Sequence, residues 1–501
     1  MCIYSQENTK AKGCGSVKNK NKIFPERLLY FLLLVITTIV ITYRAPGVLA
    51  SIWYAFLLVL YYMSKDEAFW LAFFLVTVDG FMGFMGLFSV TLNVLPDLPA
   101  IELCQFYIIL SFVKAAMSRY RPFIFYKNYL QLLLVYIIFL IVWGQMMGYT
   151  GELNAYFRII KQILPFLLFY SLPRLFTDLK TYERFFGFIF FILIIGFLTQ
   201  LFTILTGISP SGTIDFTEQQ LSEAMGFRPF FNGAATLLGL LGALFLLSGR
   251  AGQRYHKVYL YICISSAVGM VFLSATRGWI ISFGLILILA FIVALPRNTK
   301  QIIGLTVTLA LFFLLGLSNS KIRSQAVYSF ERLSTLESIT EGDITAEGTL
   351  YRLNLRGPKV MNKWKENPIF GWGFSDETRK YGDGHVGNQN LLMTTGIVGF
   401  FLIVGFLIYF SVKLFLRYLK IPRSYIYRNN IPVFLIFLAG WFIIHSTSGQ
   451  QFNVMALPLQ VIPQVVFFSL GALQYNKSIK NLPTSHVQKN PAPLPAEILN
   501  L

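Results

Sequence analysis

The chain has 501 residues, of which 55% are hydrophobic, 16% aromatic and only 13% charged, and its mean hydropathy is +0.61. Soluble globular proteins carry roughly 25% charged residues, so the composition excludes a soluble enzyme and indicates a polytopic membrane protein. The formal net charge is +19, but no basic patch interleaved with exposed aromatic residues is present. We therefore expect no nucleic-acid partner.

Apolar runs recur along most of the chain, and a run of about 17 to 25 residues is long enough to cross a bilayer core of ~30 Å as a helix. We therefore predict an all-α fold with about 12–14 transmembrane helices. The candidate spans are 28–43, 48–63, 68–92, 100–117, 129–148, 157–172, 183–206, 229–248, 257–275, 278–295, 300–317, 389–412, 430–447 and 453–473. The third contains Asp79-Gly80 and could be a re-entrant pair broken at that point.

The spans predict five regions. A basic cytoplasmic tail (1–27) precedes an N-terminal transmembrane bundle (28–317), a long external loop with short helices (318–388), C-terminal transmembrane helices (389–473) and a proline-rich cytoplasmic tail expected to be disordered (474–501). No small-residue cleavage site follows the first apolar stretch, which predicts an uncleaved first span. No internal repeat is found, which weighs against transporter folds built from inverted halves.

Charge decides the orientation. With the N-terminus in the cytoplasm and alternating spans, most lysines and arginines lie inside. The short external loops hold only Arg44, Arg158, Lys161, Arg228 and Arg277. The segment 318–388 also carries basic residues, but long loops are exempt from the positive-inside rule. The positive charge is therefore explained by anionic lipid at the cytoplasmic face, and both termini are predicted to be cytoplasmic.

Cysteine and histidine spacing predicts neither a disulfide framework nor a metal site. The four cysteines show no CxxC pattern, and none of the four histidines has a second histidine or a carboxylate at ligand spacing. Walker loops and dinucleotide fingerprints are also lacking. We expect no cofactor.

The polar stretch 349–401 holds the features best suited to chemistry. Arg352 begins an amphipathic run, a turn follows at 367–373 (NPIFGWG), and His385 precedes Gly396, where a new apolar stretch begins. Neutral imidazole can accept a proton near pH 7, which makes His385 a candidate general base. The alternative is a solvated loop histidine.

The external cations form a second candidate group. Arg158 and Lys161 lie one helical turn apart in YFRIIKQILPF, Arg228 lies in GFRPFFNGAA, and Arg277 lies in SATRGWIISFG. Guanidinium groups suit bidentate phosphate binding, so these residues could cradle a lipid-linked pyrophosphate. The alternatives are interfacial snorkelling and pairing with nearby acids.

Asp79 interrupts the apolar stretch FWLAFFLVTVDGFMGFMGLF. An acid at mid-span is costly unless it is paired or lies in a wet cavity. It could bond to a neighbouring helix, or it could relay protons, which would fit a transporter better than a transferase.

Taken in order, several of these pieces resemble the O-antigen ligase and polymerase superfamily of bacterial membrane glycosyltransferases. The resemblance lies in FRIIKQILPFLLFY (157–170), FRPFFNGAA (227–235), SATRGWIISFG (274–284), YRLNLRGPKVMNKWKENPIFGWGF (351–374), and His385 placed before TTGIVGFF (394–401). The family commonly has His-Asn followed two residues later by Leu. Here Val386 and Gly387 follow His385, and Asn388 or Gln389 could share the acceptor site.

The resemblance implies a GT-C-like fold in the bacterial cytoplasmic (inner) membrane. It also implies a metal-independent, inverting transfer of glycan from polyprenyl (undecaprenyl) diphosphate on the outer face. His385 would be the base, and the phosphate-side residues would be Arg158, Lys161, Arg228, Arg277 and Arg352. The acceptor would be a second lipid-linked glycan in O-antigen, capsule or exopolysaccharide polymerisation, or the lipid A core of lipopolysaccharide or a protein in ligation, with other polysaccharide-assembly proteins as partners. The residues that follow His385 differ from the ligase-like pattern, which favours a polymerase over a ligase.

Two other classes stay open. An exporter of lipid-linked or anionic substrates would use Asp79 for coupling and the external arginines for its substrate. A scaffold for glycan assembly would need neither set of residues for activity.

Overall fold

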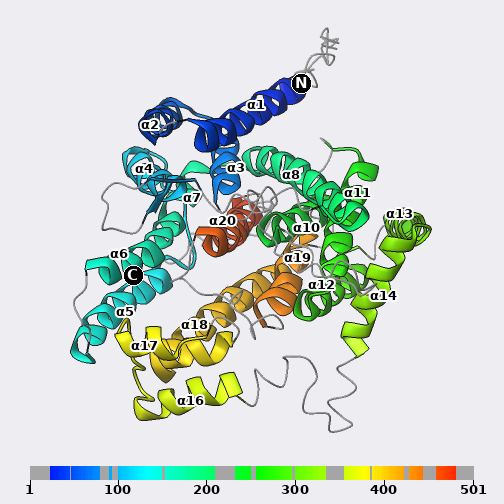
Figure 1. Ribbon diagram of the computed structural model, residues 1–501. Helices are drawn as coiled ribbons and strands as arrows, with labels where there is room; N and C mark the ends of the chain where they lie inside the picture. The colour runs from blue at the N-terminus through cyan, green and yellow to red at the C-terminus, as the bar shows by residue number, and fades with distance from the viewer. Residues whose placement is uncertain are drawn as a thin grey trace, which may run out of the picture. The chain divides into compact units, whose positions relative to one another are not determined.

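The structure is a computed structural model, and it describes residues 23–45, 47–78, 90–92, 100–148, 153–208, 232–249, 255–295, 299–334, 355–383, 386–422, 428–443 and 458–480. Helices make up nearly all of the ordered backbone in these residues (Figure 1). The strands described are β1 (Thr91–Leu92) and β2 (Ile101–Glu102), which form one antiparallel pair. The predicted all-α class is confirmed.

The chain divides into two compact units, Met1–Trp53 and Tyr54–Leu501. The first contains α1 (Ile23–Arg44) and the start of α2 (Gly47–Met63). Within this unit the Trp53 indole donates a 3.1 Å hydrogen bond to the hydroxyl of Thr38, which ties the two helices together.

The second unit holds the other helices. They are α3 (Glu67–Thr77), α4 (Leu103–Met117), α5 (Lys127–Met146), α6 (Leu153–Ile163), α7 (Leu168–Leu175), α8 (Leu179–Thr206), α10 (Gly233–Ser248), α11 (Lys257–Leu273), α12 (Arg277–Leu289), α13 (Thr299–Leu317), α14 (Ser320–Ser334), α16 (Gly357–Glu366), α17 (Asp376–Tyr381), α18 (Gly387–Lys420), α19 (Ile431–Phe437) and α20 (Pro458–Lys480). A 3-10 turn (Leu164–Leu167) joins α6 to α7, and π-helical turns extend α12 (Ala290–Ala294) and α19 (Leu438–Ile443).

Seven helices in the described part of the chain are long and apolar enough to cross a membrane, and six more apolar helices have 10–17 residues. Their bounds lie close to the predicted spans, except for the third. There, α3 ends at Thr77 with an extended Val78, two residues before Asp79-Gly80. Thr91 then pairs with Glu102 as a strand. The prediction of one helix over 68–92 is therefore wrong, and Asp79 itself lies outside the described residues. The last predicted span (453–473) also differs, because α20 continues as a helix to Lys480 and buries Gln474 and Ser478 in the segment that was expected to be disordered.

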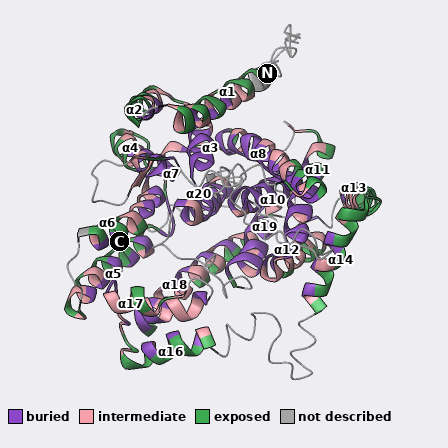
Figure 2. Cartoon of the chain, in the orientation of Figure 1, coloured by how far each residue is buried: buried purple, intermediate pink, exposed green. Residues whose placement is uncertain are grey.

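The core of the second unit is built around α10. Every residue from Ala234 to Leu247 is buried (Figure 2), as expected for a helix that is apolar on all sides. Glycines let α8 approach closely, because a Cβ added to Gly239 or Gly242 would lie 2.6 Å from Leu193 or 2.4 Å from Phe186.

Other faces are apolar and exposed. On α13, Ile303, Val307, Leu311 and Leu314 recur at helical spacing and are each at least 50% exposed. A stripe of this kind on a membrane span packs against lipid acyl chains rather than water.

Candidate functional site

The polar segment before α18 is built around a break in that helix. Gly396 has φ +63° and ψ −176°, so the helical hydrogen-bond ladder stops there. An unbroken helix would pair the N–H groups of Ile397 and Val398 with the carbonyls of Met393 and Thr394. All four backbone groups need other partners, because each costs about 1–3 kcal/mol if buried without one.

The turn at 368–373, called here the nested turn, supplies those partners. Trp372 and Gly373 donate to the carbonyls of Met393 (2.8 Å) and Thr394 (2.9 Å). In return the carbonyls of Pro368 and Ile369 accept from the N–H groups of Ile397 (2.9 Å) and Val398 (3.2 Å). The turn thus occupies the break in the helix and replaces its missing rungs.

Glycine is required where the two backbones meet. Gly371 and Gly373 have φ of +66° and +56°, which side-chain-bearing residues rarely adopt. A Cβ on Gly396 would lie 2.2 Å from the Ile369 carbonyl oxygen, and one on Gly371 would lie 2.5 Å from the Gly396 nitrogen. The sequence pattern Gly371, Gly373 and Gly396 is the local reason for this geometry.

Helix α5 supports the nested turn. The Trp143 indole donates to the Gly371 carbonyl (2.9 Å), and the Tyr136 hydroxyl donates to the Thr395 carbonyl (2.5 Å). Gly144 packs directly on Phe374, since an added Cβ would lie 2.6 Å from its backbone nitrogen. Three elements distant in sequence therefore converge on this segment.

A buried lysine fixes α17 against α16. The Lys363 ammonium lies 2.7 Å from a Glu366 oxygen, 2.5 Å from a Glu377 oxygen and 3.9 Å from the centroid of the Trp372 ring. Burial alone would lower the pKa of Lys363, but the hydrogen bonds and charges of the two carboxylates outweigh it and raise the pKa above its ordinary value. Lys363 therefore stays charged and links the helices.

Asp383 and Val386, the described residues on either side of 384–385, both contact other parts of the segment. The Asp383 carboxylate lies 3.5 Å from Arg356 Nε at the start of α16. Val386 is buried in a small apolar cluster with Val360 and Met393. His385 itself lies outside the described residues, as do Arg228 and Arg352.

A polar hollow of about 340 Å³ separates α6 from α17. It is lined by Ala155, Arg158, Ile159, Gln162, Phe374, Ser375, Asp376, Thr378 and Arg379. Arg158 is exposed and makes no hydrogen bond or ion pair with the residues that the structure describes. Arg379 lies 3.7 Å from Asp376. The hollow therefore offers two guanidinium groups beside hydroxyl and amide groups, and it also holds the Asp376 carboxylate that pairs with Arg379.

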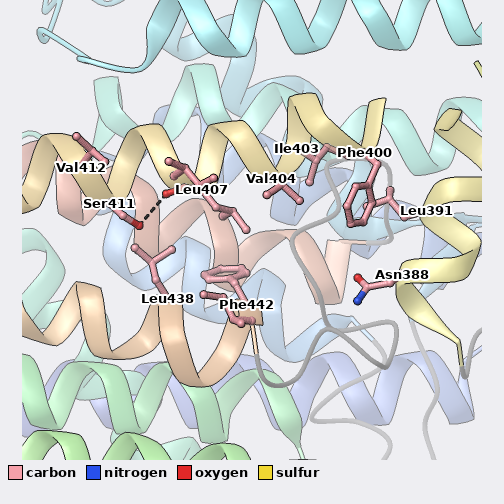
Figure 3. Close-up of a pocket in the computed structure, with 12 residues that line it drawn as sticks. Asn388, Leu391, Phe400, Ile403, Val404, Leu407, Ser411, Val412, Leu438 and Phe442 are labelled. Atoms are coloured by element: carbon pink, nitrogen blue, oxygen red, sulfur yellow. Dashed lines mark hydrogen bonds between the residues drawn. The ribbon is translucent and has the colours of Figure 1, made fainter. Parts of the chain in front are cut away.

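An apolar groove of about 430 Å³ runs along α18 (Figure 3). One wall comprises Phe400, Ile403, Val404, Leu407, Ile408, Ser411 and Val412, and the other comprises Leu438, Phe442 and Ile443. Asn388 and Leu391 lie at the end nearest the start of α18. The face from Phe400 to Val412 extends for about 18 Å at 1.5 Å per residue.

The other predicted site residues lie apart from these two cavities. The Lys161 ammonium donates to the Ala100 carbonyl (2.5 Å). The Arg277 guanidinium donates to the backbone carbonyl of Arg332 on α14. Gln389 is half-buried and lines neither cavity. The structure thus brings Arg158 to the hollow and Asn388 to the groove, while Lys161 and Arg277 make structural contacts.

Four residues of this region were not predicted from the sequence: Arg356, Lys363, Arg379 and Asn390. Arg356 comes directly before α16, and Lys363 and Arg379 belong to the short helices α16 and α17. Each of these helices carries several charged residues, and none of them stands out. Asn390 is a single polar residue near the start of an apolar stretch. No spacing rule selects it.

Fold and site together define an all-α polytopic membrane protein with a polar segment nested in a broken helix. Residues 261–404, from α11 into α18, match the family model described as O-Antigen ligase. The match confirms the predicted resemblance over the segment that carries Arg277, the nested turn and Asn388, and it points to a membrane enzyme of polysaccharide assembly. No curated protein matches the chain.

Proposed function

We propose that the protein is a glycosyltransferase that moves a glycan from a polyprenyl diphosphate to a polysaccharide acceptor on the outer face of the cytoplasmic membrane. One observation carries the proposal. The segment that contains the nested turn and the start of α18 contributes to both an arginine-lined polar hollow and an apolar groove. A lipid-linked sugar diphosphate has these same two parts, one anionic and one apolar.

The groove suits the lipid. Its walls are leucine, isoleucine, valine and phenylalanine side chains on α18 and on the π-helical turn that follows α19. Both the groove and a branched isoprenoid chain lie in the bilayer, so van der Waals packing against these walls, and not removal of apolar surface from water, would hold the chain there. Asn388 marks the polar end, three residues after His385.

The hollow suits the anionic end of the donor. When the anomeric carbon–oxygen bond breaks, negative charge grows on the departing diphosphate, and fixed cations stabilise it. Arg158 lines the hollow and makes no ion pair with a described residue, and Arg379 lines the opposite wall, where it lies 3.7 Å from Asp376. Arg228 and Arg352 are proposed to add to this charge when the donor is bound. Arg277 is left out of this group, because it lies apart from the hollow and its guanidinium donates to the Arg332 carbonyl.

The chemical step needs one base. His385 takes the proton of the acceptor hydroxyl, the oxygen attacks the anomeric carbon from the face opposite the diphosphate, and polyprenyl diphosphate leaves with its bonding electron pair. The anomeric configuration inverts. No step of this scheme requires a metal ion. Asn388 and Gln389 are proposed to hold the acceptor, and the sequence around His385 tilts the choice of acceptor to a second lipid-linked glycan.

A His385→Ala strain tests the base. The expected result is loss of surface-polysaccharide chains with accumulation of lipid-linked repeat units. The matched control is His256→Asn, because His256 caps α11 at an exposed position and asparagine preserves a cap. Wild-type chain length and attachment in the His385→Ala strain would remove His385 from the mechanism. Export of glycan without elongation or attachment by the wild-type protein would favour a transporter.

A further inference from the structure

The side chain of Asn390 bonds to the backbone of Asp383 in both directions. Its Oδ1 accepts from the Asp383 N–H at 2.9 Å, and its Nδ2 donates to the Asp383 carbonyl. The backbone closes the same unit, since Val386 N–H donates to the Asp383 carbonyl (3.1 Å) and Asn390 N–H donates to the Val386 carbonyl (2.9 Å). One amide thus joins the residues on the two sides of 384–385.

Two further contacts anchor that unit. The Asp383 carboxylate is 3.5 Å from Arg356 Nε, which ties it to α16. Val386 is 4% exposed and packs with Val360 and Met393. The backbone before and after 384–385 is therefore tied to α16 as well as to α18.

Asn390 faces away from the two cavities. It lines neither the apolar groove nor the polar hollow, whereas Asn388, two residues earlier on the same helix, lines the groove. Residues two apart on a helix point in nearly opposite directions. Asn390 is consequently placed to act on the chain at 383–386 and not on a bound substrate.

We propose that Asn390 is a positioning residue for His385, with Arg356 assisting through Asp383; the inference rests on the proposed function. A general base must lie within hydrogen-bond reach of the proton it removes, and a misplacement of about 1 Å costs about 100-fold in rate. Asparagine meets the need because it accepts and donates at once. Aspartate keeps the acceptor and loses the donor.

The test uses the full chain in nanodiscs with a synthetic polyprenyl-diphosphate oligosaccharide and its acceptor. The variants are Asn390→Ala, Asn390→Asp and His385→Ala, and the matched control is Asn362→Ala, which alters an exposed asparagine on α16. Two quantities are measured for each variant: kcat and the donor KM of glycan transfer, and the rate of backbone hydrogen exchange over 383–391.

Asn390→Ala is expected to lower kcat roughly 10- to 100-fold with little change in donor KM, as for loss of alignment at a reacting centre. Exchange should accelerate over 383–391 and stay unchanged over 357–366. Asn390→Asp should fall between wild type and Asn390→Ala, and Asn362→Ala should match wild type.

Three results would overturn the positioning role. These are wild-type kcat in Asn390→Ala, a donor KM that rises as kcat falls, and faster exchange throughout α16 and α18. The His385→Ala arm separates the two claims. An inactive His385→Ala beside a wild-type Asn390→Ala refutes the positioning role alone, whereas an active His385→Ala refutes the proposed base and the positioning role with it.

Discussion

Arg158 shows what the sequence could and could not predict at the scale of single residues. It was selectable because it is a cation in a short external loop, against the charge bias of a membrane protein. Arg379, on the other wall of the hollow, could not be selected from the sequence. Helix α17 reads DETRKY, and its charged residues follow no pattern that distinguishes Arg379 from the others. The meeting of Arg158 and Arg379 across the hollow depends on where α17 lies, which hydrogen bonds between distant backbone segments decide.

Arg158→Gln should raise the donor KM or lower kcat about 10-fold or more, because one charge-assisted contact to phosphate is worth roughly 1.5–3 kcal/mol. The assay is glycan transfer in nanodiscs with donor concentration varied. Arg323→Gln, at an exposed arginine on α14, is the charge-matched control. Equal kinetic constants for Arg158→Gln and wild type would exclude Arg158 from donor binding.

Lys363→Met should destabilise the α16–α17 pair by about 1–3 kcal/mol, because it leaves Glu366 and Glu377 without their shared ammonium. Thermal unfolding in detergent measures the loss. Lys365→Met, at an exposed position on the same helix, is the control and should be near neutral. A wild-type melting temperature for Lys363→Met would show that this contact is not stabilising.

The same pair predicts a pH dependence. The pKa of Lys363 is raised in the folded protein, so its stabilisation is fully present below the ordinary lysine pKa of about 10.4 and is lost as the pH rises through the raised value. The difference in melting temperature between wild type and Lys363→Met should therefore be constant from pH 7 to about 10 and shrink above it. A difference that shrinks between pH 7 and 9 would contradict the assignment.

At the scale of elements, helix positions were predictable and the nested turn was not. Bilayer thickness sets the length of an apolar run, so spans such as 300–317 could be located to within a few residues. The glycine and proline pattern at 367–373 also predicted a turn. Its insertion into α18 could not be foreseen, because the predicted span 389–412 reads as one continuous helix. The four replacement hydrogen bonds join that span to a turn more than 20 residues earlier in the chain.

Gly396→Ala should destabilise the protein by about 2–4 kcal/mol, because the Cβ would collide with the Ile369 carbonyl and the backbone has positive φ. Gly284→Ala on α12 is the matched control, since nothing lies within 4 Å of its added Cβ and alanine favours helix. Melting temperature and the yield of monodisperse protein report the effect. A Gly396→Ala protein as stable as Gly284→Ala would contradict the broken-helix geometry.

At the scale of the whole molecule, composition alone predicted a polytopic membrane protein. Only 13% of its residues are charged, which is about half the share found in soluble globular proteins. The orientation remains a prediction from charge. It places the segment 318–388 outside and the end of α18 inside. The polar hollow then faces the exterior, where an acceptor glycan would be found.

Single-cysteine labelling tests this orientation. In a background where Cys2, Cys14, Cys104 and Cys263 are replaced, Lys365→Cys on α16 should react with a membrane-impermeant maleimide in intact cells. Lys420→Cys, at the far end of α18, should react only after the cells are opened. The reverse pattern would invert the topology and place the hollow on the cytoplasmic side.

The most direct measurement is glycan transfer by the purified protein in nanodiscs from a defined polyprenyl-diphosphate oligosaccharide. The donor is supplied alone or with lipid A core, and each reaction is run with and without a chelator. We predict a longer or newly attached glycan, one polyprenyl diphosphate released for each bond formed, no effect of the chelator, and no product with His385→Ala. Absence of any glycan product, together with movement of the intact lipid-linked donor across a bilayer, would contradict the account.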